Sequence, residues 1–270
     1  MKILKAIIAG ERKAQVLAAL RDRHCQNSVE TIAKSLVGNY REEHLFALRQ
    51  ALELYETYQV KIADCEAAIA AYLLRQEHHT NDEPPAPQKP IPARNRLRAG
   101  VDIRDQLYKM SGVDLFRVSG LAADTLLTLA GEVGFDMSPW QSVKHFTSWL
   151  ALCPGTKQSG KRVLSRKTKP SANRAAQAFR MAAVTQARAK TALGAFYRRI
   201  RGRSGGREAV TATAHKIARI FYSLLKHGSA YVEQGEAAYE QQFKERRLKA
   251  LKKQAIALGY QLSPLAATSF

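Results

Sequence analysis

The sequence predicts a mostly α-helical protein with a long helical arm, a proline-rich linker and a compact basic domain. Apolar residues recur at steps of three and four along most of the chain, which is the period of an amphipathic helix. No segment has a strong alternating strand pattern. Prolines 84, 85, 87, 90 and 92 interrupt the helical pattern and favour an extended spacer.

The arm is predicted from the helical pattern between Arg41 and Glu77. Gln59 and Glu66 share its apolar seam and weaken it. The spacing favours a long amphipathic helix and a coiled coil through which the chain forms homo-oligomers. The apolar positions of the seam are Leu45, Leu48, Leu52, Tyr55, Ile62, Ile69 and Leu73.

Two shorter helices are predicted before the arm. The start, MKILKAIIAGER, is a helix rather than a signal peptide, because Lys5 interrupts its short apolar run. In SVETIAKSLVGN, Ser28 is the predicted cap and Gly38-Asn39 the end of the second helix.

The charge is strongly positive and unevenly placed. The chain has 43 Lys and Arg and 23 Asp and Glu residues, for a net charge of +20. Residues 11–83 are close to neutral, so the excess lies beyond residue 89. This one-sided charge predicts a polyanionic partner, and nucleic acid is the commonest one.

Composition also argues against several other classes of protein. No apolar run is long enough to span a membrane, so no membrane partner is expected. The three cysteines lie far apart without metal-ligand spacing, which argues against zinc. An odd number of cysteines without a disulfide framework fits the reducing cytoplasm.

The domain after the linker is predicted to be a series of helices. In LFRVSGLAADTLLTLAGEVG, two helices flank a Ser119-Gly120 turn, and the second ends at Gly134. SPWQSVKHFTSWLAL is predicted as a helix with Ser138 as its cap and Pro139 at its first position.

Three further helices follow. Ser171 is the predicted cap of SANRAAQAFRMAAVTQARAK, whose alanines indicate tight helix packing. Apolar residues from Val210 onward mark a helix that ends at Gly228. Residues 236–258 are predicted to form a charged helical tail.

The most informative segment is residues 154–180, PGTKQSGKRVLSRKTKPSANRAAQAFR. It contains eight Lys or Arg residues and no acid, and no carboxylate occurs between Asp136 and Glu208. Two interpretations of Ser159 stay open: a turn hydroxyl, or a nucleophile toward a DNA phosphodiester whose charge nearby cations stabilise. The predicted nucleic-acid-binding residues are Lys157, Lys161, Arg162, Arg166, Lys167, Lys169, Asn173, Arg174 and Arg180.

Two other motifs carry weaker predictions. Gly155 to Lys161 has the frame of a nucleotide phosphate loop, but Arg162 replaces the required Ser or Thr, so no nucleotide site is predicted. The Ser119-Gly120 turn allows two interpretations: a packed hairpin, or backbone amides at a helix N-terminus that bind a DNA phosphate.

Several segments together resemble an insertion-sequence transposase family. The most specific part lies between Trp149 and Tyr222 and includes WLALCPGTKQSGKR, SRKTKPSANRAAQAFRMAAVTQARAKTALGAFYRRI and VTATAHKIARIFY. The arm, LFALRQALELYETYQVKIADCEAAIAAYL, and LAGEVG add to it. Family members join an N-terminal RuvC-like DEDD domain to a C-terminal transposase domain, and they are similar to Piv-type DNA invertases.

The resemblance implies a bacterial transposase that binds double-stranded DNA, with Ser159 as the catalytic serine of strand exchange. In some members a structured noncoding RNA selects the DNA, so a guide RNA is a further implied partner. Members more often have Glu-Ser-Ala-Gly-Lys where this chain has Gln158-Ser159-Gly160-Lys161. Members commonly have Gly-x-Gly in the hairpin, where this chain has Gly120-Leu121-Ala122.

The resemblance also implies that the RuvC-like DEDD domain is missing from this chain. The family binds Mg²⁺ through four carboxylates of the DEDD domain, and no such set precedes the linker. Asp102 and Asp105 lie beyond the linker beside Arg104 on a predicted helix, so we assign them no metal. No metal or other cofactor is therefore expected in this chain, and Mg²⁺ is expected only with the DEDD domain.

The expected product is the C-terminal part of a transposase, inactive alone and associated with the nucleoid in the cytoplasm. Whether it acts as an enzyme stays open. One alternative is a non-enzymatic nucleic-acid-binding remnant that associates with full-length transposase, and another is an unrelated basic RNA-binding protein. The implied divisions are 1–27 (end of the RuvC-like domain), 28–79 (coiled-coil arm), 80–99 (linker), 100–232 (transposase domain) and 233–270 (charged tail).

Overall fold

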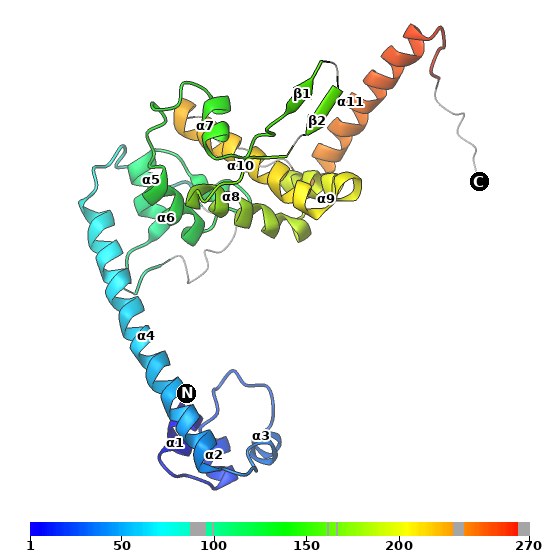
Figure 1. The fold of residues 1–270 in the computed structure, drawn as a ribbon. Coiled ribbons are helices and arrows are strands. Elements are labelled where there is room, and N and C mark those ends of the chain that lie inside the picture. Colours follow the sequence, from blue (N-terminus) through cyan, green and yellow to red (C-terminus); the bar gives the residue numbers. More distant parts are fainter. Residues whose placement is uncertain (87–95, 99, 161, 166, 229–234, 264–270) are drawn as a thin grey trace. The chain divides into compact units, whose positions relative to one another are not determined.

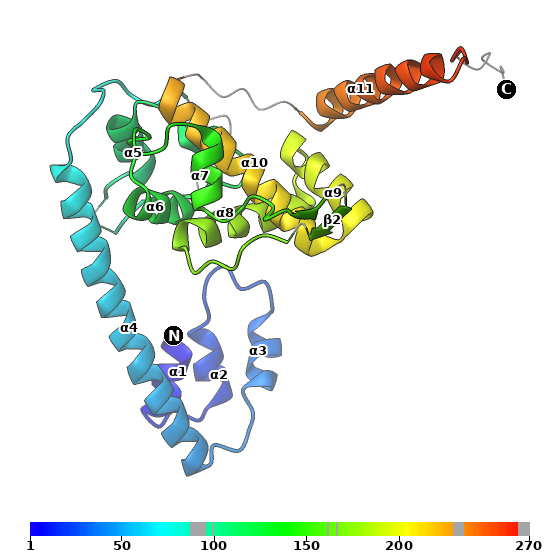
Figure 2. The same cartoon turned by 45° about the horizontal axis from the view of Figure 1, so that its top comes forward.

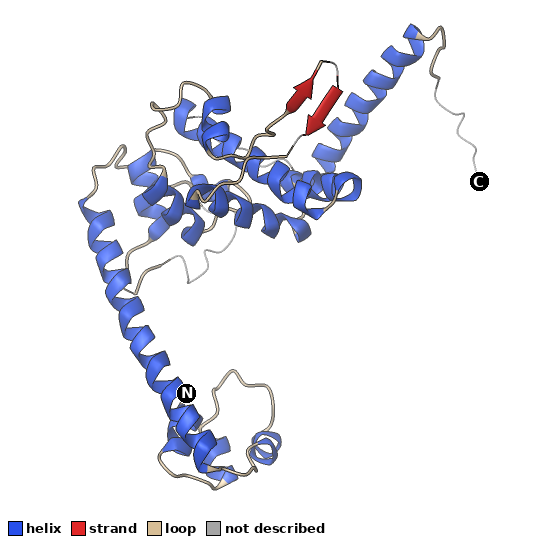
Figure 3. Ribbon diagram, viewed as in Figure 1, coloured by secondary structure: helices blue, strands red, loops and turns tan. Residues whose placement is uncertain are grey.

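The computed structural model describes residues 1–86, 96–98, 100–160, 162–165, 167–228 and 235–263. Over these residues the protein is mostly helical, as predicted, with one small two-stranded sheet (Figures 1 and 3). The chain divides into two compact units, Met1–Ile69 and Ala70–Phe270. Within the described ranges, we find no helix with the length and hydropathy needed to cross a membrane.

The first unit contains three short helices and most of a long one (Figure 2). The short helices are α1 (Lys2–Ile8), α2 (Ala14–Ala19) and α3 (Val29–Ser35). Ser28 caps α3 as predicted, because its Oγ accepts a hydrogen bond from the N–H of Thr31 at 3.1 Å.

The predicted long helix is confirmed as α4 (Glu42–Arg75). Its predicted single seam is wrong, because the apolar residues follow two lines. Leu45, Leu48 and Leu52 are half-buried and Leu73 is buried, on the first line. The second line is exposed and has alternating steps of three and four: Tyr55, Tyr58, Ile62, Cys65, Ile69 and Tyr72.

The second unit is a helical domain around one hydrophobic core. It starts with the end of α4 and continues with α5 (Ile103–Ser111), the 3-10 helix η2 (Leu115–Arg117), α6 (Ala123–Glu132) and α7 (Val143–Trp149). Strands β1 (Lys157–Ser159) and β2 (Arg162–Ser165) follow. The remaining elements are α8 (Arg174–Thr185), η3 (Gln186–Arg188), α9 (Ala192–Ser204), α10 (Gly206–His227) and α11 (Glu236–Ala257).

Small residues let α8 and α10 pack closely in this core. Ala176 and Ala183 of α8 and Ala214 of α10 are completely buried, which confirms that the alanines serve helix packing. Phe179 and Phe221 meet edge to face beside them, with ring centroids 5.5 Å apart. The predicted end of α10 is also confirmed, because Gly228 adopts a left-handed C-cap conformation.

The predicted start of α7 is wrong. The cap is Ser142, whose Oγ accepts from the N–H of His145, whereas Ser138 lies in the preceding turn. There the Asp136 carboxylate accepts hydrogen bonds from the hydroxyl and the N–H of Ser138, at 2.5 and 2.8 Å. These bonds lower the pKa of Asp136.

The predicted cap of α8 is wrong for a similar reason. Asn173 is the cap, because its Oδ1 accepts a hydrogen bond from the N–H of Ala176 at 2.9 Å. The Oγ of Ser171 instead accepts from the N–H of Asn173 at 3.1 Å. The earlier serine thus forms the turn that leads into the helix.

The described start of the proline-rich segment is held against α5 and the residues after it. The Pro85 carbonyl accepts from Nη2 of Arg104 at 2.6 Å. The same guanidinium pairs with Asp114 at 2.5 Å, and the two side chains are only 6% and 4% exposed. Because an unpaired buried charge is costly, each partner is held in place by the other. Residues 87–95 and 99 of the predicted linker lie outside the described residues.

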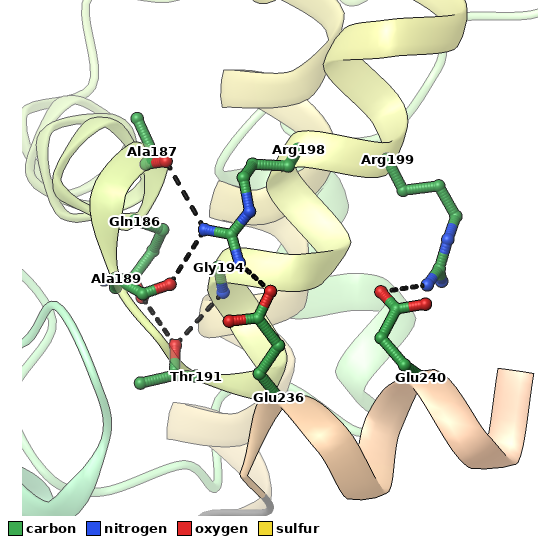
Figure 4. A network of polar contacts seen from close by, with 9 residues as sticks. All are labelled: Gln186, Ala187, Ala189, Thr191, Gly194, Arg198, Arg199, Glu236 and Glu240. Atoms are coloured by element: carbon green, nitrogen blue, oxygen red, sulfur yellow. Dashed lines mark hydrogen bonds and ion pairs between the residues drawn. The ribbon is translucent and has the colours of Figure 1, made fainter.

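Two arginines of α9 hold the start of α11 (Figure 4). Arg198 pairs with Glu236 and also donates to the Ala189 carbonyl at 2.9 Å. Arg199 pairs with Glu240 at 2.7 Å, and its guanidinium lies 3.5 Å from the centroid of the Phe243 ring. The predicted helical tail is therefore confirmed as α11 and is attached to the domain through its first turns.

Candidate nucleic-acid interface

The basic segment forms an antiparallel hairpin, although the sequence predicted no strand there. Ser159 pairs with Arg162 and Lys157 with Ser165 across the two strands. Gly160 makes the turn with φ +55°, and Nε2 of Gln158 donates to the Gly160 carbonyl at 2.6 Å. Both faces of these short strands are exposed apart from the half-buried Ser165, so no alternation of apolar and polar residues reveals them in the sequence.

Gly155 closes the base of the hairpin. Its N–H donates to the Lys167 carbonyl at 2.9 Å, and Pro154 bridges to Thr168 nearby. A Cβ at position 155 would lie 3.0 Å from the Lys167 carbonyl oxygen, so glycine suits this close approach. The backbone segments on either side of the hairpin are therefore paired where they leave the domain.

Buried residues fix the point at which the chain leaves α7. Leu150 and Leu152 are 0% and 2% exposed. Ala151 between them has φ +52°, in the left-handed region that costs a non-glycine residue about 1–2 kcal/mol. Burial of both leucines stabilises this conformation, and the chain turns out of the core toward the hairpin.

Ser159 is exposed at the turn end of β1. Among the described residues, no hydrogen bond or ion pair occupies its hydroxyl. Four predicted phosphate-binding residues belong to the same hairpin and its base, are exposed and pair with no described carboxylate: Lys157, Arg162, Lys167 and Lys169. We call these four residues the hairpin cations. Lys161 and Arg166, predicted with them, lie outside the described residues.

The other three predicted residues lie at α8 rather than on the hairpin. Asn173 uses its side-chain oxygen to cap the helix. Arg174 forms an ion pair with Glu132 at 3.2 Å, although its side chain remains 78% exposed. Arg180 is half-buried on the same helix. The structure thus separates the predicted set into a hairpin group and a helix group.

The Ser119-Gly120 turn packs against the end of α8, which favours the packed-hairpin interpretation. Ser119 donates to Oε1 of Gln186 at 2.9 Å, and Gln186 is 1% exposed. A Cβ on Gly120, where φ is +95°, would lie 2.5 Å from Nε2 of Gln186 and 2.8 Å from the Ala182 carbonyl. Gln186 was not predicted as a functional residue, because its only signal in the sequence is a polar residue in an apolar helical segment.

The described residues do not fit the carboxylate site for Mg²⁺ that the resemblance implies. These residues contain no group of three or more His, Cys, Asp or Glu side chains that could hold a metal ion. Asp102 accepts the N–H groups of Arg104 and Asp105 at the start of α5, and Asp105 pairs with Lys109 at 2.9 Å. Both aspartates therefore have structural partners.

His215 is a further titratable group in this domain. Burial, and to a lesser extent the positive charge of Arg219, lower its pKa. The neutral imidazole is therefore favoured at position 215.

Comparison with known proteins relates part of the chain to a protein family. No curated protein and no solved structure matches the chain. Residues 114–198 match the model of the Transposase IS116/IS110/IS902 family. This segment runs from η2 into α9 and contains the whole hairpin and Gln186. The segment that carries Ser159 is therefore similar to insertion-sequence transposases, which supports a role in DNA transposition or recombination.

Proposed function

We propose that residues 100–232 bind double-stranded DNA and supply Ser159 as the nucleophile of transposition or site-specific recombination. The observation that carries this proposal is the exposed Ser159 hydroxyl on a hairpin whose four exposed cations pair with no described carboxylate. No carboxylate occurs from 137 to 207 to repel a phosphate. The transposase match over residues 114–198 supports the same chemistry.

The proposed step is transfer of a DNA phosphoryl group to the Ser159 hydroxyl. Oγ attacks the phosphorus, and the bond between phosphorus and the leaving sugar oxygen breaks. The leaving sugar takes up a proton, while the Ser159 proton passes to a base. The hairpin cations stabilise the charge that develops on the non-bridging oxygens.

Cations do not accept the serine proton, and a serine hydroxyl is a weak nucleophile without a base. Since residues 137–207 contain no carboxylate, we expect the reaction to require a RuvC-like DEDD domain, as the resemblance implies. A guide RNA as partner and a place at the nucleoid in the cytoplasm belong to the same proposal.

Mass spectrometry of the trapped protein–DNA product tests the nucleophile. The chain is incubated with duplex DNA and a separate RuvC-like DEDD domain, denatured, and digested with nuclease and protease. We expect a nucleotide mass on a peptide that contains Ser159. A nucleotide on another residue would contradict the assignment, and DNA binding without any adduct would favour the non-enzymatic alternative.

Replacing all four hairpin cations with glutamine tests DNA binding by the hairpin. Each phosphate contact contributes about 0.9 to the slope of log K against log salt, so four lost contacts should make the slope shallower by about 3 to 4. Fluorescence anisotropy with labelled duplex DNA at several salt concentrations measures this slope. The affinity should fall similarly for unrelated duplex sequences, because phosphate contacts carry no base information.

A control variant removes four exposed cations from the near-neutral part of the chain. It carries glutamine at Lys13, Arg23, Lys34 and Arg49. The net charge changes equally in both variants, so only a hairpin contact predicts a larger slope change for the hairpin variant. Equal slope changes would show that the hairpin makes no specific contribution.

We also propose that a second copy of the chain covers the exposed line of α4. Tyr55 and Tyr58 are 47% and 65% exposed, and Ile62 and Ile69 are 43% and 38% exposed. The alternating steps of three and four along this line are those of a coiled-coil core. A helix with such a line is expected to bury it against an identical helix.

Ile62→Glu should therefore shift the full chain toward monomer in analytical ultracentrifugation. Val60→Glu is the matched control, because Val60 is 58% exposed on the same helix. At 100° per residue, Val60 lies on the side of α4 opposite the exposed line. A wild-type monomer, or equal effects of both substitutions, would contradict self-association through this line.

A further inference from the structure

One side of α10 carries a row of polar and basic residues. Lys216, Arg219, Ser223 and Lys226 follow steps of three, four and three, which place them on one face of a helix. From Lys216 to Lys226 the row spans about 15 Å at 1.5 Å per residue. The opposite side of α10, which includes Ile217 and Phe221, is buried in the core.

This row lines a cavity of about 590 Å³ between α10 and the start of α7. Gln141 contributes an amide from the α7 side, and Ser223 a hydroxyl from α10. Among the described residues that line it, the charged or titratable ones are Lys216, Arg219, Lys226 and His227, and none is a carboxylate. None of the hairpin cations lines this cavity.

Arg219 and Lys226 are exposed and form no ion pair or hydrogen bond through their side chains among the described residues. The positive charge of Lys226 contributes to the lowered pKa of Asp136, and that of Arg219 to the lowered pKa of His215. Lys216 lies 4.6 Å from the Phe196 ring centroid.

We infer that this cavity and its cationic row bind the phosphodiester backbone of a nucleic acid, at a second contact apart from the hairpin. Each strand of a duplex carries one charge per about 3.4 Å of helix axis, so the row is long enough to contact several phosphates. An elongated row of cations suits such a repeating anion, and the amide and hydroxyl can donate to phosphate oxygens. The inference rests on the proposed function only in taking nucleic acid as the partner.

The proposed function has two nucleic-acid partners, duplex DNA and a structured RNA, and both present a phosphodiester backbone. The test therefore uses the full chain with two probes, a labelled 30-base-pair duplex and a labelled RNA hairpin. The variant is Arg219→Gln with Lys226→Gln. The matched control, Lys34→Gln with Arg49→Gln, also loses one exposed Lys and one exposed Arg.

The α10 variant should make the salt slope shallower by about 1.8 for duplex DNA, or by about 1.4 where the bound RNA is single-stranded. The control should leave both slopes near wild type. A change with DNA only or with RNA only supports the inference and identifies the source of the backbone. Slopes unchanged with both probes would overturn it.

The hairpin variant separates this inference from the proposed function. If the hairpin variant makes the slope shallower and the α10 variant does not, the second contact is wrong and the proposed function stands. If wild-type binding of both probes is independent of salt, both fail. Combining the two sets of substitutions should add their slope changes, because two separate contacts release counterions independently.

Folding of the α10 variant is checked by thermal melting monitored by circular dichroism. The substituted residues are exposed, so the melting temperature should stay within a few degrees of the wild-type value. If the variant unfolds, Arg219→Lys with Lys226→Arg keeps both charges and should retain the wild-type slope. A changed slope in that conservative variant, with the fold intact, would contradict a purely electrostatic contact.

Discussion

Replacing Ser159 with alanine is expected to abolish covalent attachment of DNA in the presence of a RuvC-like DEDD domain. The substitution removes the only oxygen that the side chain at position 159 offers to a phosphorus atom. DNA affinity should change by no more than about twofold, because the hydroxyl is exposed and the hairpin cations remain. A denaturing gel with labelled DNA measures the adduct, and anisotropy measures binding.

Ser165→Ala is the matched control on the opposite strand. Ser165 pairs with Lys157 in the same hairpin, and its Oγ accepts from the N–H of Lys167 at 3.2 Å. The control should still form the adduct. If Ser159→Ala also forms it, Ser159 is not the nucleophile, and Ser165 and Ser171 become the next hydroxyls to replace.

Gly194→Ala is expected to destabilise the second unit by about 3 kcal/mol or more, because overpacking against a fixed backbone cannot easily relax. A Cβ at position 194 would lie 2.0 Å from the Ala189 carbonyl oxygen and 3.1 Å from that of Gln186. Since Gln186 also receives the Ser119 hydrogen bond, the clash should loosen the turn before α6 as well. Chemical denaturation of the full chain measures the loss.

Gly202→Ala on the same helix should have the opposite sign. Nothing lies within 4 Å of a Cβ built at Gly202, so alanine gains helix propensity without a clash. The expected stabilisation is about 0.5–1 kcal/mol. Equal destabilisation by both substitutions would show that α9 does not pack against the Gln186 to Ala189 segment as closely as the structure indicates.

The helices themselves were largely predictable, because the signals that form a helix are local. The apolar period located α4 and α10, and Ser28 and Gly228 marked a start and an end. Helix α9 was not predicted from its own pattern. Its sequence, ALGAFYRRIRGRS, combines two glycines with four arginines, and most of its apolar residues lie in the first half, so no apolar period runs along the whole helix.

The caps show where local signals became ambiguous. Ser138 and Ser142 are both good cap residues, as are Ser171 and Asn173. The structure selects the second of each pair, because the first is used in the turn that leads into the helix. The same ambiguity affected the seam of α4, where a three-four spacing fits both a covered and an exposed line.

The order of amino acids is enough to locate the basic segment, its lack of carboxylates and Ser159 within it, because charge and residue order are properties of the chain. Three features appear only in the folded protein: the hairpin that carries Ser159, the hydrogen bond of Gln186 to the Ser119-Gly120 turn, and the cavity beside α10. The last two features join residues far apart in the sequence, whereas the hairpin pairs nearby residues on exposed strands that carry no alternating pattern. The distant contacts form only after burial of the apolar faces has fixed which polar side chains meet and which remain exposed.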